Sequence, residues 1–177
     1  NIKIAIDTHK RSGTKELLTS LVTDTIDNLK TQIIRLIPFY ERGDIAGIHL
    51  EGPYLSHNRC GAHEPTLLRL PDLNEVKSLL DIGSGAIAMV TIAPELPGAI
   101  EVIKYLEKNG IIAAIGHTDG DANDAAAAID AGASVVTHFT NAMSKLRDGK
   151  NSFTQRVFDD SRIALELIVD GVHVPLA

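Results

Sequence analysis

The sequence of 177 residues has a single cysteine, no block of basic residues and no long apolar run. Cys60 alone cannot form an internal disulfide framework, which fits a reducing compartment. With no basic block and a formal net charge of −6, a nucleic-acid or anionic-membrane surface is not expected. There is also no signal peptide and no apolar stretch long enough to cross a bilayer. We therefore expect a cytoplasmic protein with neither a nucleic-acid nor a membrane partner.

The composition is that of an ordinary globular protein. Hydrophobic residues make up 44% of the chain and charged residues 23%, and 177 residues are enough to bury a core. No low-complexity segment, sequence repeat or linker interrupts the chain. We therefore treat residues 1–177 as part of a single domain.

Short apolar runs alternate with amphipathic stretches along the chain. The runs predicted as strands are Glu16–Val22, Ile45–Leu50, Ala86–Ile92, Ile111–Ile115, Ser134–Phe139 and Ile163–Val169. The stretches predicted as helices are Thr25–Tyr40, Leu73–Ile82, Gly98–Asn109, Asp121–Ala131 and Ser152–Asp160. The predicted strands are largely apolar rather than cleanly alternating, as in a parallel sheet covered on both faces. Asp72 and Asp121 are expected N-caps, and Gly110 and Gly132 are expected at helix C-termini.

Six strand–helix units allow either an open doubly wound sheet or part of a closed barrel. A complete eight-stranded barrel usually needs ~250 residues. Asn1–Arg11 also reads as the end of a helix, with Lys10 and Arg11 in its last turn. We predict an α/β fold, an incomplete (β/α)8 TIM barrel with parallel strands, cut from the middle of a larger domain.

Three residues of metal-binding types fall at or just after the ends of predicted strands: Glu51, His117 and His138. Ligands and catalytic groups gather at this edge of parallel sheets. One carboxylate with two imidazoles is a common ligand set for a catalytic zinc. The alternatives are a salt bridge or a turn cap for Glu51 and packed core histidines for the others, which is our interpretation of His49. No HExxH or CxxC motif is present.

Two loops combine glycine with cationic residues, at 59–65 and 144–150. Such loops can hold a phosphate through Arg, Lys, His and backbone N–H groups, or they can be solvated turns. Asn141, just before the second loop, can fix a helix N-terminus or bind a polar ligand.

Taken together, the motifs resemble the N-acetylglucosamine-6-phosphate deacetylase family of the metal-dependent amidohydrolase superfamily. They are, in order, HLEGPY, GAHEP, VTIAPE, AIGHTDGDA, VVTHFTNAMSKL and LIVDGVHV, and they cover the chain from about Ser12 onward. The resemblance implies hydrolysis of the N-acetyl amide of N-acetylglucosamine-6-phosphate, giving acetate and glucosamine-6-phosphate. It also implies a divalent metal, zinc first, with iron, manganese or cobalt as alternatives.

Residue by residue, the resemblance implies metal ligands at Glu51, His117 and His138. The substrate contacts that it implies are Ala62, His63, Asn141, Ala142, Arg147 and His173. The ligand would be a phosphorylated amino sugar, and the parent enzyme a homo-oligomer.

Two features of the family are missing from this sequence. One is a His-rich metal segment upstream; the other is a downstream Asp in a Ser/Thr-Asp-Ala context that acts as general acid and base. We therefore expect no catalytic residue in this chain and little or no activity from it alone. The phosphate-binding Arg of the family lies in an REPG-like loop, which here reads RDGKNS, so Arg147 is the nearest candidate.

Other functions remain compatible with the sequence. One is an amidohydrolase acting on a different N-acyl sugar or a cyclic amide. Another is a non-catalytic barrel segment that binds a phosphosugar or serves as a scaffold. Strand edges left open in an incomplete barrel would favour self-association.

Overall fold

Six parallel strands form one sheet, in the same order in which they follow one another along the chain. The computed structural model describes residues 2–146, 149 and 151–174. The strands are β1 (Leu18–Val22), β2 (Gly47–Glu51), β3 (Ile87–Ile92), β4 (Ile112–Ile115), β5 (Val135–Val136) and β6 (Ala164–Leu165). The helices are α1 (Ile2–Arg11), α2 (Ile26–Glu41), α3 (Leu73–Gly83), α4 (Ala99–Lys108), α5 (Ala122–Asp130) and α6 (Phe153–Phe158). Two 3-10 turns, η1 (His57–Arg59) and η2 (Pro65–Leu67), follow β2.

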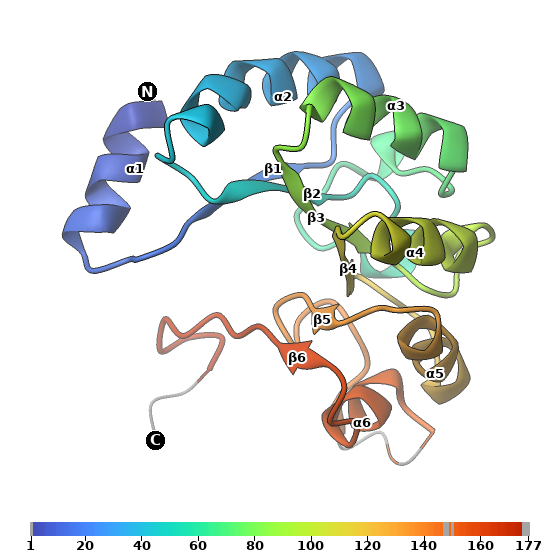
Figure 1. Cartoon of the computed structure of the whole chain (residues 1–177). Coiled ribbons are helices and arrows are strands. Elements are labelled where there is room, and N and C mark those ends of the chain that lie inside the picture. The colour runs from blue at the N-terminus through green and yellow to red at the C-terminus, as the bar shows by residue number, and fades with distance from the viewer. Residues whose placement is uncertain (1, 147–148, 150, 175–177) are drawn as a thin grey trace.

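The sequential strand order decides between the two architectures that the sequence allows. A doubly wound sheet reverses its strand order at a switch point, whereas a (β/α)8 barrel does not. The helices from α2 to α6 form an arc outside the strands, and the open side lies between α1 and the C-terminal segment (Figure 1). The prediction of an incomplete barrel is therefore confirmed.

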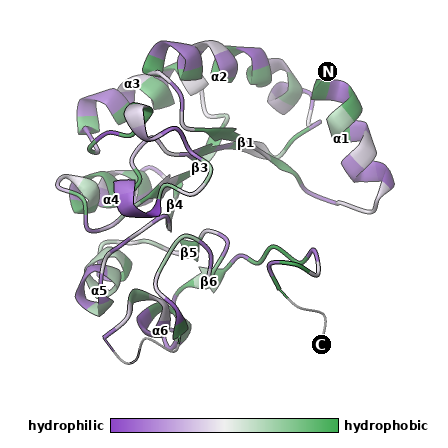
Figure 2. Cartoon of the chain, turned by 180° about the vertical axis from the view of Figure 1, so that it is seen from behind, coloured by the Kyte–Doolittle hydropathy of each residue, from purple (hydrophilic) through white to green (hydrophobic). Residues whose placement is uncertain are grey.

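The expected helix caps are present. The side chain of Asp72 accepts a hydrogen bond from the backbone of Glu75, and Asp121 forms a capping box with Asp124 at the start of α5. Gly110 and Gly132 both have positive φ, as a left-handed residue after a helix requires. In Figure 2 the strands are largely hydrophobic, and the helices alternate between hydrophobic and hydrophilic residues as amphipathic helices do.

The core lies between the helices and the strands. Leu29 and Ile33 of α2, Ile103 of α4, and Ile48 and Ile115 of the sheet are all fully buried. Burying such a side chain contributes roughly 1.5–3 kcal/mol, so this layer holds the strands in register. Among the described residues, no helix has both the length and the apolar character needed to span a bilayer.

The last two predicted strands are longer in the sequence than in the structure. The strand predicted at Ser134–Phe139 is reduced to Val135–Val136, because His138 and Thr140 adopt positive φ and turn the chain away from the sheet. The strand predicted at Ile163–Val169 is reduced to Ala164–Leu165. β6 is at the edge of the sheet, so the residues after it have only one neighbouring strand with which to pair. Both predictions were wrong in length, although the strands themselves exist.

Candidate metal centre at the carboxyl ends of the strands

The three residues predicted at the strand ends come from three different strands of the sheet. Glu51 is the last residue of β2, and His117 and His138 each lie two residues beyond the ends of β4 and β5. Both histidines have left-handed backbones, with φ of 48° and 33°. Such a conformation costs a non-glycine residue energy and persists only where the surroundings hold it, which is common at functional sites.

The polar atoms of these three side chains converge on one point. Glu51 Oε1 lies 3.1 Å from Nε2 of His117 and 3.0 Å from Nε2 of His138. The two Nε2 atoms are 2.9 Å apart. The structure therefore brings together the trio that the sequence predicts, with its nitrogen and oxygen atoms facing inward.

The hydrogen bond on the far side of the His117 ring determines which nitrogen carries the proton. Nδ1 of His117 lies 2.8 Å from the backbone carbonyl of Arg59, and a carbonyl oxygen can only accept. In the neutral ring the proton is therefore on Nδ1, and the lone pair of Nε2 faces Glu51. Two hydrogen-bond acceptors at this distance repel each other unless a cation lies between them.

A divalent metal fits this arrangement of atoms. Zinc bound at 2.0–2.1 Å in a tetrahedron has ligand atoms about 3.3 Å apart. The separations of 2.9–3.1 Å between the three atoms are close to that value. Nδ1 of His138 is buried and has no hydrogen-bond partner in the described part of the chain.

His63 approaches the same cluster but has the opposite tautomer. Its Nε2 lies 3.7 Å from Glu51 Oε1, and the group Glu51, His63 and His117 also satisfies the distances of a metal site. However, Nδ1 of His63 contacts Thr23 twice, at 2.8 Å from the hydroxyl, which can donate or accept, and at 3.3 Å from the backbone N–H, which can only donate. The proton of the neutral ring is then on Nε2, so His63 presents an N–H donor and not a lone pair to the cluster. This chemistry favours His138 over His63 as the third ligand.

The cluster strongly favours a negative charge on Glu51. The three imidazoles around its Oε1, those of His117, His138 and His63, hold the pKa of Glu51 far below its usual value and outweigh the effect of burial. Burial lowers the pKa of His138, but the hydrogen bond to Glu51 and its charge outweigh burial and raise it. A carboxylate that stays ionised at neutral pH suits a cation site.

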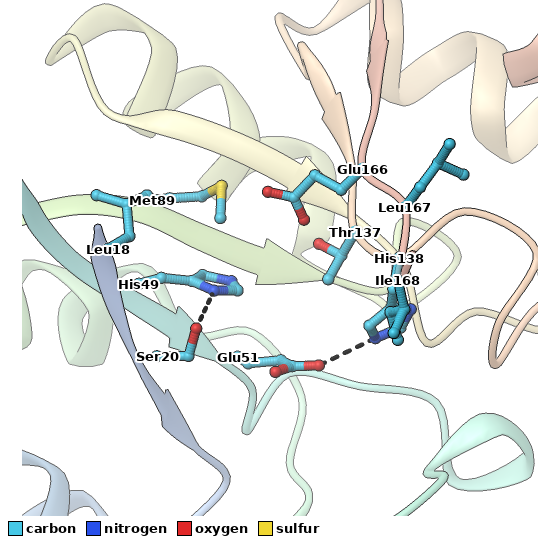
Figure 3. Close-up of a pocket in the computed structure, with 10 residues that line it drawn as sticks. All are labelled: Leu18, Ser20, His49, Glu51, Met89, Thr137, His138, Glu166, Leu167 and Ile168. Carbon is cyan, nitrogen blue, oxygen red and sulfur yellow. Dashed lines mark hydrogen bonds and ion pairs between the residues drawn. The ribbon is translucent and has the colours of Figure 1, made fainter. Parts of the chain in front are cut away.

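A row of polar side chains lies beside the cluster, along the wall of the same cavity. The cavity has a volume of about 570 Å³ and is lined by His49, Glu51 and His138 among others (Figure 3). His49 contacts Ser20 Oγ through Nδ1 at 3.0 Å and Thr91 Oγ1 through Nε2 at 2.7 Å. Burial lowers the pKa of His49 to about 4. The interpretation of His49 as a packed, hydrogen-bonded residue is confirmed.

The residues predicted to contact substrate differ in their distance from the cluster: Asn141 contacts His138, whereas His173 has no described contact with the cluster. Asn141 donates from its side chain to the carbonyl of His138 at 3.2 Å, which leaves its own carbonyl oxygen available. Ala142 accepts a hydrogen bond from Thr118 N–H through its backbone, and Ala62 is exposed in the loop that carries His63. His173 is exposed and contacts Asp170 at 2.7 Å, and none of its described contacts is to the cluster. Arg147 lies outside the described residues.

Three partners of the site carry no signal of their own in the sequence. Thr23 sets the tautomer of His63, the Arg59 carbonyl sets that of His117, and Thr91 holds His49. Backbone groups and hydroxyls of this kind belong to no motif, so only the folded structure can reveal them. The guanidinium of Arg59, which the sequence offers for phosphate, forms an ion pair with Asp119 at 2.8 Å.

Comparison with known proteins gives a consistent picture. No protein-family model matches the sequence. It is 32% identical over 171 residues to an N-acetylgalactosamine-6-phosphate deacetylase from Escherichia coli O157:H7, covering 94% of this chain and 45% of that protein. It is 33% identical over 173 residues to an N-acetylglucosamine-6-phosphate deacetylase from Bacillus subtilis (strain 168), covering 93% of this chain and 44% of that protein. The chain thus spans less than half the length of these relatives.

Solved structures agree in fold. The N-acetyl-D-glucosamine-6-phosphate deacetylase from Mycobacterium smegmatis is 46% identical, with a TM-score of 0.92 over 96% of this chain and 45% of that one. The enzyme from Pasteurella multocida is 32% identical, with a TM-score of 0.87 over 97% of this chain and 45% of that one. A variant of the Mycobacterium smegmatis enzyme has been solved in complex with N-acetyl-D-glucosamine-6-phosphate.

The fold and the site define an incomplete barrel with a cluster of His and Glu side chains, able to hold a metal ion, at the carboxyl edge of its strands. Within that class, the predicted resemblance to the N-acetylglucosamine-6-phosphate deacetylases, which hydrolyse an amide, is confirmed over nearly the whole chain.

Proposed function

We propose that the protein to which this chain belongs deacetylates N-acetylglucosamine-6-phosphate with the help of a divalent metal, for which zinc is the first candidate. The observation that carries the proposal is the convergence of Glu51 Oε1 with Nε2 of His117 and His138 at 2.9–3.1 Å. Two ring nitrogens and a carboxylate of strongly lowered pKa at this spacing are an arrangement that suits a cation.

Each residue of the site has a distinct task in this proposal. Glu51, His117 and His138 would hold the metal, which supplies a water activated at neutral pH and polarises the amide carbonyl. His63 presents its Nε2–H beside the cluster and would donate a hydrogen bond to the substrate. Asn141 would accept from the substrate through its free carbonyl oxygen, since its N–H group is bonded to the backbone.

The remaining contacts are assigned by resemblance. Ala62, Ala142, Arg147 and His173 would also contact the sugar phosphate. His173 must then move from its present place beside Asp170 or meet the substrate at the rim.

The proposal treats residues 1–177 as part of one barrel domain. The general acid and base of the reaction would come from the Ser/Thr-Asp-Ala segment that this sequence lacks. We therefore propose that this chain binds metal and ligand but has little or no turnover. Turnover at a rate comparable with a full-length deacetylase would contradict that statement.

The nature of the sugar is the main alternative. The Escherichia coli O157:H7 relative is named for N-acetylgalactosamine-6-phosphate, whereas the more similar Mycobacterium smegmatis structures are named for the glucosamine form. The higher identity of 46% favours the glucosamine form.

Ligand binding to the zinc-loaded chain tests the proposal. N-acetylglucosamine-6-phosphate, N-acetylgalactosamine-6-phosphate and unphosphorylated N-acetylglucosamine would each be titrated by calorimetry, with and without a chelator. We expect the first sugar to bind most tightly, and only when zinc is present. Phosphosugar binding that is indifferent to chelator would instead indicate a non-catalytic binding segment.

A further inference from the structure

A closed set of hydrogen bonds lies on the side of His117 that faces away from Glu51. Its first member is the bond from Nδ1–H of His117 to the carbonyl of Arg59, at 2.8 Å. The orientation of the imidazole, and the direction of its Nε2 lone pair, therefore depend on the position of a loop carbonyl.

The loop is held by the side chain of Asp119. One carboxylate oxygen accepts from Nε of Arg59 at 2.8 Å, and the other accepts from Nδ2 of Asn58 at 3.0 Å. Asp119 follows His117 by two residues. The segment that carries His117 therefore also carries the carboxylate that holds Arg59, and the carbonyl of Arg59 accepts the hydrogen bond from His117.

Asp119 is itself anchored. Its backbone N–H donates to Glu95 Oε1 at 2.8 Å, and Oγ1 of the buried Thr118 donates to Glu95 Oε2 at 2.5 Å. Glu95 follows β3, so the turn after β4 is tied to the neighbouring strand end. Although the carboxylate of Asp119 is partly exposed, its position is held by the side-chain contacts with Arg59 and Asn58 and by the backbone contact with Glu95.

We propose that Asp119 is a positioning residue for His117: it holds the Arg59 carbonyl against Nδ1–H and so directs the Nε2 lone pair at the metal position. This inference rests on the proposed metal centre and adds to it a residue to which the resemblance gives no role. Outer partners of metal-binding histidines commonly set metal affinity in this way. The same contact holds the loop that carries His63.

An exposed ion pair that does not position His117 would have little effect on stability or on metal affinity. The Arg59 and Asp119 side chains are each 39% exposed, and pairs of this kind contribute about 0–1 kcal/mol to stability. The test must therefore report on the His117 ring and on metal affinity, not on stability.

The variants are Asp119→Ala, Arg59→Ala and the two combined. Arg59→Ala keeps the backbone carbonyl and removes only its anchor. Asp44→Ala is the matched control, because it breaks another exposed ion pair, with Arg42 at 2.9 Å, away from the site.

The first readout is the exchange rate of the His117 Nδ1–H proton in the metal-free chain, measured by NMR. We expect slow exchange in the parent and in Asp44→Ala, and at least tenfold faster exchange in both single variants. Exchange in Asp119→Ala as slow as in the parent overturns the inference.

The second readout is zinc affinity, measured by competition with a chromogenic chelator. Each single variant is expected to bind about tenfold more weakly than the parent, since loss of an outer partner typically costs 10–100-fold. The double variant should be no more than about twofold weaker than either single variant, because both break the same contact. A loss of zinc affinity in the double variant equal to the two single losses combined would show that Arg59 and Asp119 act separately, and would overturn the inference. A parent that binds no zinc would refute the proposed metal centre, while the NMR readout would still decide the role of Asp119.

Discussion

At the residue scale, the tautomer of His63 separates this histidine from the three proposed metal ligands. His63 accepts through Nδ1 from the Thr23 backbone and presents Nε2–H, whereas Nε2 of His138 lies 3.0 Å from Glu51 in the converging trio. We predict that His138→Ala weakens zinc binding by at least 100-fold and that His63→Ala changes it by less than about fivefold. Competition with a chromogenic chelator measures both.

The exposed His57 of the same loop is the matched control, and His57→Ala should bind zinc like the parent. Equal losses in His63→Ala and His138→Ala would show that His63 is a ligand after all.

His49 makes stability depend on pH in a direction that its burial determines. Its pKa is about 4 in the folded chain against an ordinary 6.5. As the pH falls below 6.5, the unfolded chain takes up a proton that the folded chain refuses until about 4. The contribution of neutral His49 to the free energy of unfolding is therefore complete above pH 6.5. It is lost as the pH falls from 6.5 to about 4, and the loss reaches about 3 kcal/mol.

Urea unfolding of the chelator-treated chain at pH 7 and pH 4.5 measures this loss. His49→Gln retains a donor and an acceptor but does not titrate, so it should lose roughly 2 kcal/mol less than the parent over this interval. Identical losses in the two proteins would show that His49 is not the group responsible.

At the scale of elements, β4 leaves room for its two neighbours to meet across it. Thr91 of β3 and Thr137, just after β5, are joined by a hydrogen bond of 2.7 Å between their hydroxyls. Gly116 lies at that level after β4, and a Cβ added there would lie 3.1 Å from Thr137 Cβ and 3.6 Å from Thr91 Cγ2. A side chain on β4 would separate the two threonines.

We predict that Gly116→Ala lowers the free energy of unfolding by about 1–3 kcal/mol, as overpacking of a core does. Ser134→Ala, at an exposed position beside β5, should change it by less than about 0.5 kcal/mol. Urea denaturation of both variants gives the comparison. A Gly116→Ala chain as stable as the parent would mean that the threonine pair is not constrained by β4.

The sequence predicts the elements well where local chemistry decides them. Asp72, Asp121, Gly110 and Gly132 mark helix ends because capping is a local interaction. Strands β5 and β6 are shorter than their apolar runs, because pairing with a neighbour, and the left-handed turn at His138, are tertiary features. The sequence predicts that Glu51, His117 and His138 converge, because parallel strands end at one edge of a sheet. It does not predict their backbone partners at Thr23 and Arg59, because backbone groups are the same in every residue.

At the scale of the whole molecule, β1 and β6 are the two edges of an unclosed sheet. Exposed apolar side chains follow β6, with Leu167 52% and Val169 68% exposed. Unpaired edges of this kind promote association between chains. We predict that the apparent mass of the chain in sedimentation velocity rises with concentration, and that replacing Leu167 and Val169 with Lys reduces the rise. A single monomeric species at every concentration would contradict this.

The central claim is that Glu51, His117 and His138 hold one metal ion, and metal content per chain tests it most directly. The chain would be loaded with zinc, desalted and analysed for zinc and protein, beside Glu51→Gln, His117→Ala and the control Glu101→Gln on the exposed side of α4. We predict about one zinc per chain in the parent and the control, and almost none in the other two. Equal zinc in the parent and Glu51→Gln, or none in any of them, would contradict the account.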